Sequence, residues 1–417
     1  MMLADIAAQI RARQPVVEAW FEQKAQTIPI PLFLSCDIRH SGNKIAVIDA
    51  NLFPAGFNNL CSIYAKQAVA AFGEALRFRF PGVTRVLLLS ESHTRNKFYF
   101  ENIWHLQAML AEAGLSVRIG MIEPEFDGVL TVDLGENRTL ALYAVRADTV
   151  RHDQIVWDDF VPEVVVSNND FSAPLPPYWA RVSQPIVPPP AVGWQHRRKS
   201  RHFAHLEALV TEFAEVADVD PWSLSCRFDA VDDVDLNDPS DQARIAGKAE
   251  ALFAALESDY AARGVGSTPY LFLKSDSGTY GMGVTAIYSP DELRQLNRKL
   301  RNKLLSSKAG TPNTSFILQE GIPTDDFYSE QPIEPVIYLI DGKFVGGFFR
   351  INPLRDAYSS LNAQGMQFSC LCLHKLDQPH EWPFIQCTDK ADLVVVSTYL
   401  ARISALAAGM EMQELPD

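Results

Sequence analysis

The feature of this chain that most restricts its fold is a glycine-punctuated turn between two apolar segments, within residues 271–288. The first segment ends at Lys274, and the loop after it contains Gly278, Gly281 and Gly283. Glycine adopts backbone conformations with positive φ and lets consecutive N–H groups approach an anion closely. A lysine beside such a loop supplies a point charge that suits a polyphosphate. The pattern therefore predicts a phosphate-binding loop.

The flanking segments distinguish between the kinds of phosphate loop. A P-loop has Lys-Ser or Lys-Thr after its glycines and then a helix, whereas here the lysine precedes the glycines. The dinucleotide fingerprint G-x-G-x-x-G also opens a helix. Here the order is G-x-x-G-x-G, and residues 284–288 are rich in β-branched and aromatic types, which favours a strand. We therefore predict a β-hairpin whose tip covers phosphates; the alternative is an ordinary glycine-rich hairpin turn.

Length, charge and cysteine usage limit the class of protein. The 417 residues are too many for one ordinary core and predict two or three domains. The formal net charge of −14 argues against nucleic acid or an anionic membrane as partner, and no apolar run approaches the roughly 20 residues that span a bilayer. The six cysteines are scattered and form no zinc or redox motif, and the N-terminus is unlike a secretory signal. We expect a cytoplasmic protein with small-molecule substrates and leave open whether it forms a homo-oligomer.

The first half of the chain has the pattern of a parallel α/β sheet. Residues 84–90 read as a Val/Leu strand, a helical segment follows to residue 113, and residues 116–122 read as the next strand. Ligands of such sheets bind beyond the carboxyl ends of the strands, where His93 and Arg95 would lie. Arg95 is the better candidate, as a clamp for a carboxylate, because His93 is more simply a cap or surface residue.

Amide side chains follow two other predicted strands in this half. The loop at residues 49–59 carries amides rather than charges, and Pro54 and Gly56 fix its shape. Rigid amide-rich loops suit a zwitterionic substrate; the alternative is that Asn58 or Asn59 caps the next helix. The candidate substrate residues are Asn51, Asn58, Asn59, Arg95, Asn168, Asn169 and Asp170.

A proline-rich segment, residues 171–193, separates this half from a dense basic run at residues 197–201. Such a segment is extended and semi-rigid, so it predicts a domain boundary near residue 192. Arg197, Arg198 and Lys199 would open the following helix, where three cations oppose the helix dipole. A bound anion would relieve this repulsion; the alternative is a solvated basic face.

The second half alternates helices and strands around the glycine-rich turn. The predicted helices are 241–263, 290–305 and 390–408, with a strand at 315–322 and a hairpin at 336–350 turning at Asp341-Gly342. Residues that suit phosphate chemistry follow one another in the order Lys199, Lys274, Gln319-Glu320, Arg350 and Asn362. The sequence has no Ser-His-Asp arrangement, G-x-S-x-G or H-E-x-x-H motif, which favours a reaction without a protein nucleophile.

This order of residues resembles that of ATP-grasp carboxylate–amine ligases, and most closely the bacterial glutathione synthetase type. The full chain looks like the ATP-grasp-related glutamate–cysteine ligase family of proteobacteria. The closer likeness rests on residues 49–59, 167–170, 197–203 and 274–283. It implies an α/β fold, α+β in the C-terminal half, in which an N-terminal doubly wound-type parallel sheet domain precedes ATP-grasp lobes. The implied domains are 1–192 for substrate binding, 193–325 with the phosphate flap, and 326–417 as the C-terminal lobe.

The resemblance also implies ATP and Mg²⁺ as cofactors and gives roles to single residues. The catalytic residues would be those that hold the ATP phosphates and stabilise the transferring phosphoryl group, namely Lys199, Lys274 and Arg350. The flap over the phosphates would comprise Gly278, Thr279, Tyr280, Gly281 and Gly283. The adenine and ribose edge would be formed by Gln319, Glu320 and Ile322. Magnesium would lie near Asn362, Glu334 and Asn352.

Two features depart from the family pattern. ATP-grasp ligases usually place an Asp and a Glu-x-Asn set as metal ligands near the C-terminal strand, whereas residues 410–417 contain no Glu-x-Asn. The metal site is therefore built differently, or its last element is missing from this chain. Glutathione synthetases open the penultimate hairpin with a basic residue, whereas this chain has Glu334-Pro335, which weakens the glutathione synthetase interpretation.

The implied reaction joins L-glutamate to L-cysteine. ATP would phosphorylate the γ-carboxylate, and the amine of cysteine would displace phosphate to give γ-glutamylcysteine, the first step of glutathione biosynthesis. The alternatives are glutathione synthetase, another glutamate–amine ligase, or a nucleotide-binding regulator without turnover; a dehydrogenase is disfavoured because G-x-G-x-x-G follows no strand. Because Lys274 would stand at the end of a hairpin strand, we expect it to contribute little to the core.

Overall fold

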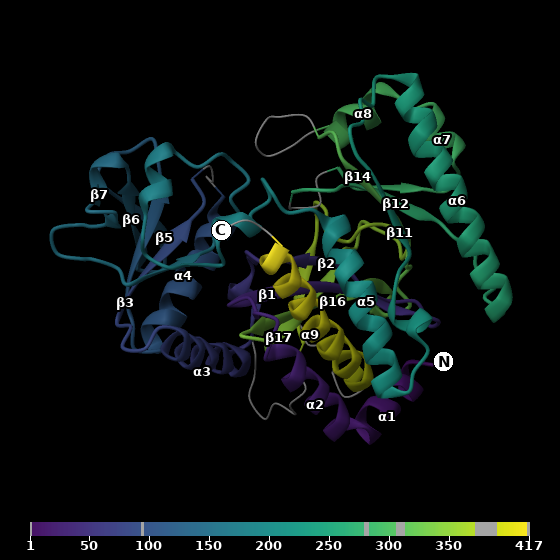
Figure 1. Cartoon of the computed structure of the whole chain (residues 1–417), viewed down its shortest axis with the longest axis horizontal. Coiled ribbons are helices and arrows are strands. Elements are labelled where there is room, and N and C mark those ends of the chain that lie inside the picture. The colour runs from purple at the N-terminus through teal and green to yellow at the C-terminus, as the bar shows by residue number, and fades with distance from the viewer. Residues whose placement is uncertain (1, 93–95, 279–282, 306–312, 372–389, 415–417) are drawn as a thin grey trace.

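The computed structural model arranges three large β-sheets around a group of packed helices (Figure 1). It describes residues 2–92, 96–278, 283–305, 313–371 and 390–414. The parallel sheet lies on one side of the molecule and the third sheet on the other, with the central sheet between and below them in this view. Most buried apolar side chains form one continuous core, and a second core lies between the third sheet and the helices that pack on it.

The central sheet is antiparallel and combines strands from both ends of the chain. Its order is β18-β17-β16-β1-β2, and β15 also pairs with β16. Asp341 and Gly342 both have positive φ in the turn between β16 and β17, as their Asp-Gly sequence predicts. The strands are β1 (Phe33–His40), β2 (Ile45–Asn51), β15 (Phe327–Tyr328), β16 (Gln331–Ile340), β17 (Lys343–Ile351) and β18 (Gln367–Cys370).

The second sheet has the order β10-β9-β3-β4-β6-β5, and all its neighbours are parallel except β5, which is antiparallel to β6. The Val/Leu residues of β3 are fully buried, as expected for a strand covered on both faces. The strands are β3 (Arg85–Ser90), β4 (Ser116–Ile122), β5 (Val129–Gly135), β6 (Arg138–Val145), β9 (Val164–Ser167) and β10 (Ile186–Val187). The associated helices are α3 (Ser62–Arg79) and α4 (Lys97–Glu112).

The third sheet contains the predicted glycine-rich hairpin and has the order β11-β14-β12-β13. Its apolar face packs on α6 (Pro239–Arg263), whose N-terminus is capped by Asp238. The helix predicted over 290–305 is instead two helices, α7 (Asp291–Arg294) and α8 (Arg298–Leu305). The strands are β11 (Phe228–Val231), β12 (Leu271–Ser275), β13 (Thr285–Ile287) and β14 (Phe316–Glu320).

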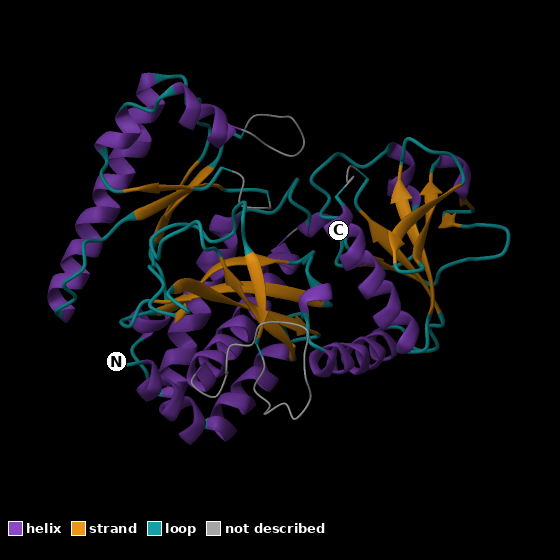
Figure 2. Ribbon diagram, turned by 180° about the vertical axis from the view of Figure 1, so that it is seen from behind, coloured by secondary structure: helices purple, strands orange, loops and turns teal. Residues whose placement is uncertain are grey.

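Helix α9 (Ala391–Glu414) packs under the central sheet together with α5 (Lys199–Ala217) and α1 (Leu3–Ala12), and α2 (Gln14–Ala25) lies beside α5 (Figure 2). By length and composition α9 could cross a membrane, but 72% of its most apolar window is buried inside the protein. A Cβ at Gly409 would fall 1.9 Å from the carbonyl oxygen of Pro29, so this helix approaches a neighbouring backbone very closely. The packing is that of a core helix.

Two short strands and five 3₁₀ helices complete the described elements. They are β7 (Val150–Arg151), β8 (Gln154–Ile155), η1 (Phe57–Asn59), η2 (Ala147–Thr149), η3 (Pro177–Arg181), η4 (Pro190–Val192) and η5 (Pro221–Leu224). The central sheet takes strands from the first and the last of the three predicted segments, 1–192 and 326–417. The division into these segments, and their assignment as a doubly wound domain and ATP-grasp lobes, stay predictions.

Candidate active site

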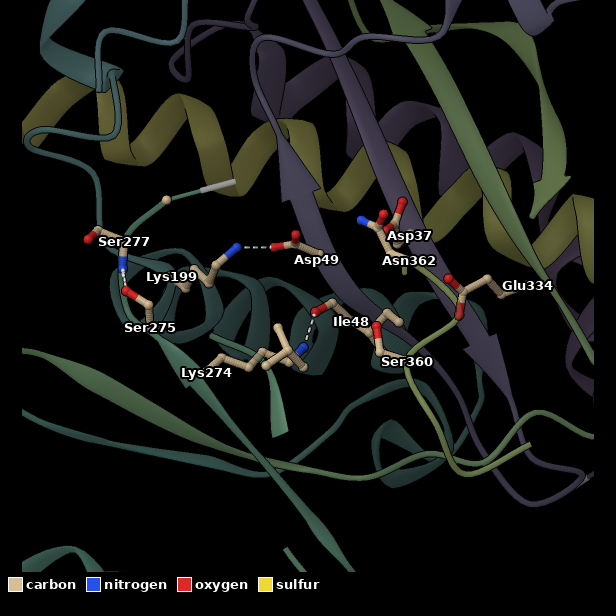
Figure 3. Close-up of a pocket in the computed structure, with 12 residues that line it drawn as sticks. Asp37, Ile48, Asp49, Lys199, Lys274, Ser275, Ser277, Glu334, Ser360 and Asn362 are labelled. Carbon is tan, nitrogen blue, oxygen red and sulfur yellow. Dashed lines mark hydrogen bonds and ion pairs between the residues drawn. The ribbon is translucent and has the colours of Figure 1, made fainter. Parts of the chain in front are cut away.

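A cavity lies where the central sheet faces the third sheet, and it collects charged residues from five elements and uncharged residues from two loops (Figure 3). Its empty volume, including the part that opens to solvent, is about 490 Å³. Its lining residues are Asp37, Ile48, Asp49, Lys199, Lys274, Ser275, Ser277, Gly278, Val284, Glu334, Ser360 and Asn362. Five of the residues predicted from the sequence therefore meet here: Lys199, Lys274, Gly278, Glu334 and Asn362.

Lys274 reaches the cavity from strand β12. Its Nζ donates to the carbonyl oxygen of Ile48 (3.0 Å) and to Oε1 of Gln319 (2.5 Å), and only 7% of the residue is exposed. Burial lowers the pKa of Lys274 to about 8, although the Asp49 carboxylate opposes this shift. The expectation that Lys274 contributes little to the core is wrong, because β12 continues to Ser275 and the lysine side chain lies inside the protein.

Lys199 reaches the same cavity as the first residue of α5. Its Nζ lies 2.5 Å from Oδ1 of Asp49 and 4.6 Å from the ring centre of Trp194. Burial would raise the pKa of Asp49, but the charges of Lys199 and Lys274 bring it below its ordinary value. The two lysines thus share one carboxylate as their counter-ion.

Arg350, predicted to be catalytic, is not among the residues that line the cavity; it lies between two carboxylates of the central sheet that do line it, Asp37 and Glu334. Its guanidinium contacts Asp37 at 2.7 and 3.2 Å and Glu334 at 2.6 Å. The other oxygen of Glu334 accepts from Nε of Arg39 at 2.7 Å. Burial raises the pKa of Asp37 even though Arg350 opposes it. In Glu334 burial acts in the same direction, but Arg39 and Arg350 together hold the pKa below its ordinary value.

The residues predicted to border adenine and ribose lie on and after β14, on both faces of that strand. Gln319 faces Lys274, whereas Glu320 points to the other face, where its oxygens accept from Nζ of Lys44 at 2.8 and 2.7 Å. Glu320 also accepts from the hydroxyl of Tyr260 at 3.0 Å. Ile322 is buried, and its carbonyl oxygen accepts from Nη1 of Arg39 at 3.2 Å. Only Gln319 of this set points toward the cavity lysines.

A second, wider cavity lies beside Lys44, on the Glu320 side of this segment, with about 890 Å³ of empty space including the part that opens to solvent. Its walls are aromatic and polar, and its one acidic lining residue is Asp325. Lys44 lies 4.4 Å from the ring centre of Trp222 and is already paired with Glu320. The lining residues are Ser41, Asn43, Lys44, Trp222, Tyr260, Val265, Ser267, Pro323, Thr324, Asp325, Phe327, Ala357 and Tyr358.

The predicted substrate amides form hydrogen bonds within the chain. Asn168 donates to the carbonyl oxygen of Pro54 (2.9 Å) and accepts from Asn102 (3.1 Å), which in turn accepts from the backbone N–H groups of Gly56 and Phe57. These contacts hold the 52–59 loop against the parallel sheet. Within this network a role as substrate contacts stays a prediction.

The other predicted substrate residues bond mainly to backbone groups of the chain. Asn51 accepts from the N–H of Phe53, Asn169 donates to the carbonyl oxygen of Ser90, and Asp170 accepts from the N–H of Ser172. Asn58 donates to Asn59 within η1. The alternative that Asn58 or Asn59 caps the next helix is wrong, because the N-cap position of α3 is Cys61.

Asn352 and Asn362 belong to one loop of the central sheet. Asn352 is fully buried, and its amide donates to the carbonyl oxygens of Leu361, Ala363 and Gln364. It therefore shapes the loop, and Asn362 is the member that lines the cavity.

Part of the predicted flap can be placed. Gly278 and Gly283 have φ values of 95° and 71°, the left-handed conformation for which glycine was expected. The predictions for the remaining residues concern positions outside the described part of the chain, namely His93, Arg95, Thr279, Tyr280 and Gly281.

The sequence reasoning missed four residues that build the site: Asp37, Arg39, Asp49 and Asp276. Asp37 and Asp49 lie directly opposite each other on β1 and β2, next to the strand that carries Glu334. The only sequence signal was an acid in each of two early strands, which gains meaning once β1 is known to pair with β16.

The charge arrangement suits a polyanion together with a divalent cation. Lysines and an arginine can hold phosphate oxygens, and carboxylate and amide oxygens are ligands that Mg²⁺ prefers. Among the described residues, no three His, Cys, Asp or Glu side chains are grouped closely enough to hold a metal ion. A cation here would therefore also need oxygen ligands from a bound phosphate.

Comparisons with known proteins agree with this chemistry. A family model described as "Glutamate-cysteine ligase" matches residues 7–412. A crystal structure described as "Putative gamma-glutamylcysteine synthetase" from Methylobacillus flagellatus KT is 33% identical, with a TM-score of 0.86, over 99% of this chain and 96% of that chain. The search of curated proteins found no match.

The protein is thus an enzyme of the ligase class, one that joins a carboxylate to an amine. The chain belongs to the glutamate–cysteine ligase family. Its activity is the formation of γ-glutamylcysteine from L-glutamate and L-cysteine, and the family depends on ATP.

Proposed function

We propose that the first cavity is the place where ATP phosphorylates the γ-carboxylate of L-glutamate and where the amine of L-cysteine then displaces phosphate. The observation that carries the proposal is the convergence of Lys199 and Lys274, from two separate elements, on one cavity, where Lys199 pairs with Asp49 and Lys274 bonds to the carbonyl oxygen of the neighbouring Ile48. A carboxylate is a poor electrophile, so its activation needs a phosphoryl donor rather than a protein nucleophile. Positioning and charge stabilisation then supply most of the catalysis.

The two lysines are the groups that bind the transferred phosphates in this proposal. Without nucleotide their charges are balanced by Asp49. A polyphosphate offers more negative oxygens than one carboxylate, so it takes over this role, and Lys199 can turn from Asp49 toward it. Lys274 is held more firmly, because Ile48 and Gln319 fix its Nζ.

Arg350 stabilises the charge that develops on the transferring phosphoryl group and on the acyl-phosphate. Its guanidinium is oriented in advance by Asp37 and Glu334, and Arg39 fixes Glu334 from the other side. A guanidinium that is already oriented loses little freedom when the reaction reaches its transition state.

The magnesium site is proposed on Asp37 and Asp49, with Asn362 and Glu334 nearby. Residues 410–417 contain no Glu-x-Asn set, so the metal ligands have to come from other elements. Strand β1 supplies Asp37 and β2 supplies Asp49-Ala-Asn51, in the same sheet as Arg350. The donor set consists of hard oxygens, which fits Mg²⁺. When bound, the ion neutralises phosphate charge and orients the transferred group. Asn352 is a weaker candidate, because its amide group faces three carbonyl oxygens.

We also propose that the third sheet with α6 and the central sheet are the two lobes of an ATP-grasp fold, related in this half to glutathione synthetase. The support is the order strand, lysine, glycine turn and strand, followed by the Gln319–Ile322 segment and the β16–β17 hairpin. The parallel sheet would then present glutamate and cysteine to the cavity, through the amide loops and Arg95. Its domain would lie within residues 1–192, apart from β1 and β2, which belong to the central sheet, ahead of lobes at 193–325 and 326–417.

The experiment is phosphate release from ATP and Mg²⁺ with L-glutamate, with and without L-cysteine, and in parallel with γ-glutamylcysteine plus glycine. We expect release that requires glutamate and cysteine, is abolished by EDTA and restored by Mg²⁺, and falls at least about 100-fold in Lys199→Ala. Lys343→Ala is the matched control, because this lysine forms an exposed pair with Glu74 far from the cavity. An unchanged Lys199→Ala enzyme would overturn the site, and release only with γ-glutamylcysteine and glycine would instead indicate glutathione synthetase.

A further inference from the structure

The N-terminus of helix α5 carries an unfavourable arrangement of charge. The helix begins at Lys199, directly after two arginines, and cations are disfavoured near the positive end of a helix dipole. Its N-cap residue, Arg198, makes no side-chain capping hydrogen bond. The first backbone N–H groups of a helix need acceptors, so another part of the molecule must supply them.

That acceptor is Asp276, from the turn that follows β12. Its backbone carbonyl oxygen accepts from the N–H of Lys199 at 2.7 Å, and its Oδ1 accepts from the N–H of Ser200 at 2.7 Å. Its Oδ2 accepts from the hydroxyl of Ser200 at 2.7 Å. Asp276 is 2% exposed, and its own N–H donates to the carbonyl oxygen of Ser315 at 3.0 Å.

The sequence predicted that an anion would relieve the repulsion at this helix terminus, and the anion is a carboxylate of the chain itself. A phosphate is therefore not needed to cap α5, and the alternative of a solvated basic face is wrong for Arg197. That residue is 2% exposed and pairs with Glu411 at 2.9 and 3.1 Å. The helix start is fixed before any ligand binds.

The position of Asp276 matters for the reaction because it lies two residues after Lys274. One short segment therefore carries one cavity lysine and caps the helix that begins with the other. We propose that Asp276 is a positioning residue, which fixes the start of α5 so that Lys199 and Lys274 face the same phosphate group. This inference rests on the proposed function of the two lysines and adds a residue that does not line the cavity.

Two substitutions of Asp276 distinguish the effect of its hydrogen bonds from the effect of its charge. Asp276→Ala removes both side-chain contacts to Ser200, while Asp276→Asn can still accept from the Ser200 N–H and donate to its hydroxyl. We expect Asp276→Ala to raise the KM for ATP and lower kcat, with kcat/KM for ATP falling by about 10- to 100-fold, as a displaced catalytic group predicts. Asp276→Asn should lose less, and the KM for cysteine should change little in either variant.

The deciding test is a double-mutant cycle with Lys199→Ala, read from kcat/KM for ATP and from the Kd for ADP by calorimetry. If Asp276 acts through Lys199, the double variant matches Lys199→Ala within about twofold, whereas a merely structural role multiplies the two losses. The control is Asp238→Ala, which removes an aspartate N-cap from α6 (Oδ1 accepts from the N–H of Ser240 at 2.8 Å). It should lower Tm without changing the KM for ATP.

The outcomes distinguish the two proposals. Independent losses in the cycle would overturn the positioning role of Asp276 and leave the lysine site intact. If Lys199→Ala alone releases phosphate as fast as the parent enzyme, the proposed function of the site is overturned. If Asp276→Ala fails to fold, the cycle is repeated with Asp276→Asn and with Ser200→Ala. Each of these variants must lower kcat/KM for ATP when Lys199 is present and cause no further loss when it is combined with Lys199→Ala.

Discussion

Lys274 is expected to reduce the stability of the protein while it serves the reaction. Its ordinary pKa of 10.5 falls to about 8 in the fold, mainly because the ammonium is buried. A shift of this size corresponds to about 3 kcal/mol of unfavourable ionisation at neutral pH. Replacing the charge by an apolar chain of similar length, Lys274→Met, removes that cost. It also leaves the acceptors on Ile48 and Gln319 unpaired, which costs about 1–3 kcal/mol.

The stability difference between Lys274→Met and the parent depends on pH, because the folded and unfolded chains bind the Lys274 proton with different affinity. Between pH 8 and pH 10.5 the unfolded chain holds the Lys274 proton more tightly than the folded one, so the parent protein gains stability as pH rises through this window. The stability of Lys274→Met relative to the parent should therefore be highest at or below pH 8. We expect this difference to fall by about 2 kcal/mol between pH 7.5 and pH 10, whatever the fixed loss from the unpaired acceptors.

The assay is urea unfolding of parent and variant at pH 7.5 and pH 10, followed by tryptophan fluorescence and by circular dichroism. Coinciding transitions from the two probes would justify converting midpoints to free energies. Lys343→Met, which replaces a lysine side chain that is 60% exposed, is the control and should differ from the parent by less than about 0.5 kcal/mol at both pH values. A Lys274→Met difference that is the same at both pH values would refute the idea of a desolvated charge.

Three further changes test other parts of the structure. Arg350→Ala should abolish phosphate release and also destabilise the protein by about 3–5 kcal/mol, because two carboxylates stay buried without their partner; a normal urea midpoint would contradict this. Burial would raise the pKa of Glu411, but Arg197 and His202 bring it to about 2. The ionised Glu411 therefore stabilises the fold above pH 4.5, and this contribution is lost as the pH falls toward 2. Acid unfolding of Glu411→Gln should lack this pH-dependent loss of stability. Gly409→Ala should lower Tm by several degrees, since its Cβ would meet a carbonyl oxygen at 1.9 Å; an unchanged Tm would show that α9 can shift.

Local patterns were enough to predict many elements and part of the cavity. The Val/Leu strand, the Asp-Gly hairpin and the paired strands on either side of the glycine-rich turn are each encoded in a few neighbouring residues, and the described residues contain all three. The family resemblance implied that Lys199 and Lys274 reach the ATP phosphates from two elements, and both lysines line one cavity. Their role in binding phosphate stays a prediction.

The remaining site residues depend on contacts between distant segments. Asp37 becomes part of the cavity only because β1 pairs with β16, and no periodicity within residues 33–40 encodes that partner. Asp276 stood in the predicted turn, but its role depends on a helix that starts 77 residues earlier, at Lys199. The burial of Lys274 likewise follows from the central sheet that covers it.

The order of strands in the central sheet also determines when its strands can pair during synthesis of the chain. Strand β1 ends at His40, while its neighbour β16 begins at Gln331, so roughly 290 residues are made between the two. At about 5–20 residues per second this takes on the order of 15–60 s. During that interval one edge of the β1–β2 hairpin has no native partner, and a lone hairpin is marginally stable in water. The nascent chain is therefore expected to need protection of this edge, by a chaperone or by the ribosome, until its last quarter is made.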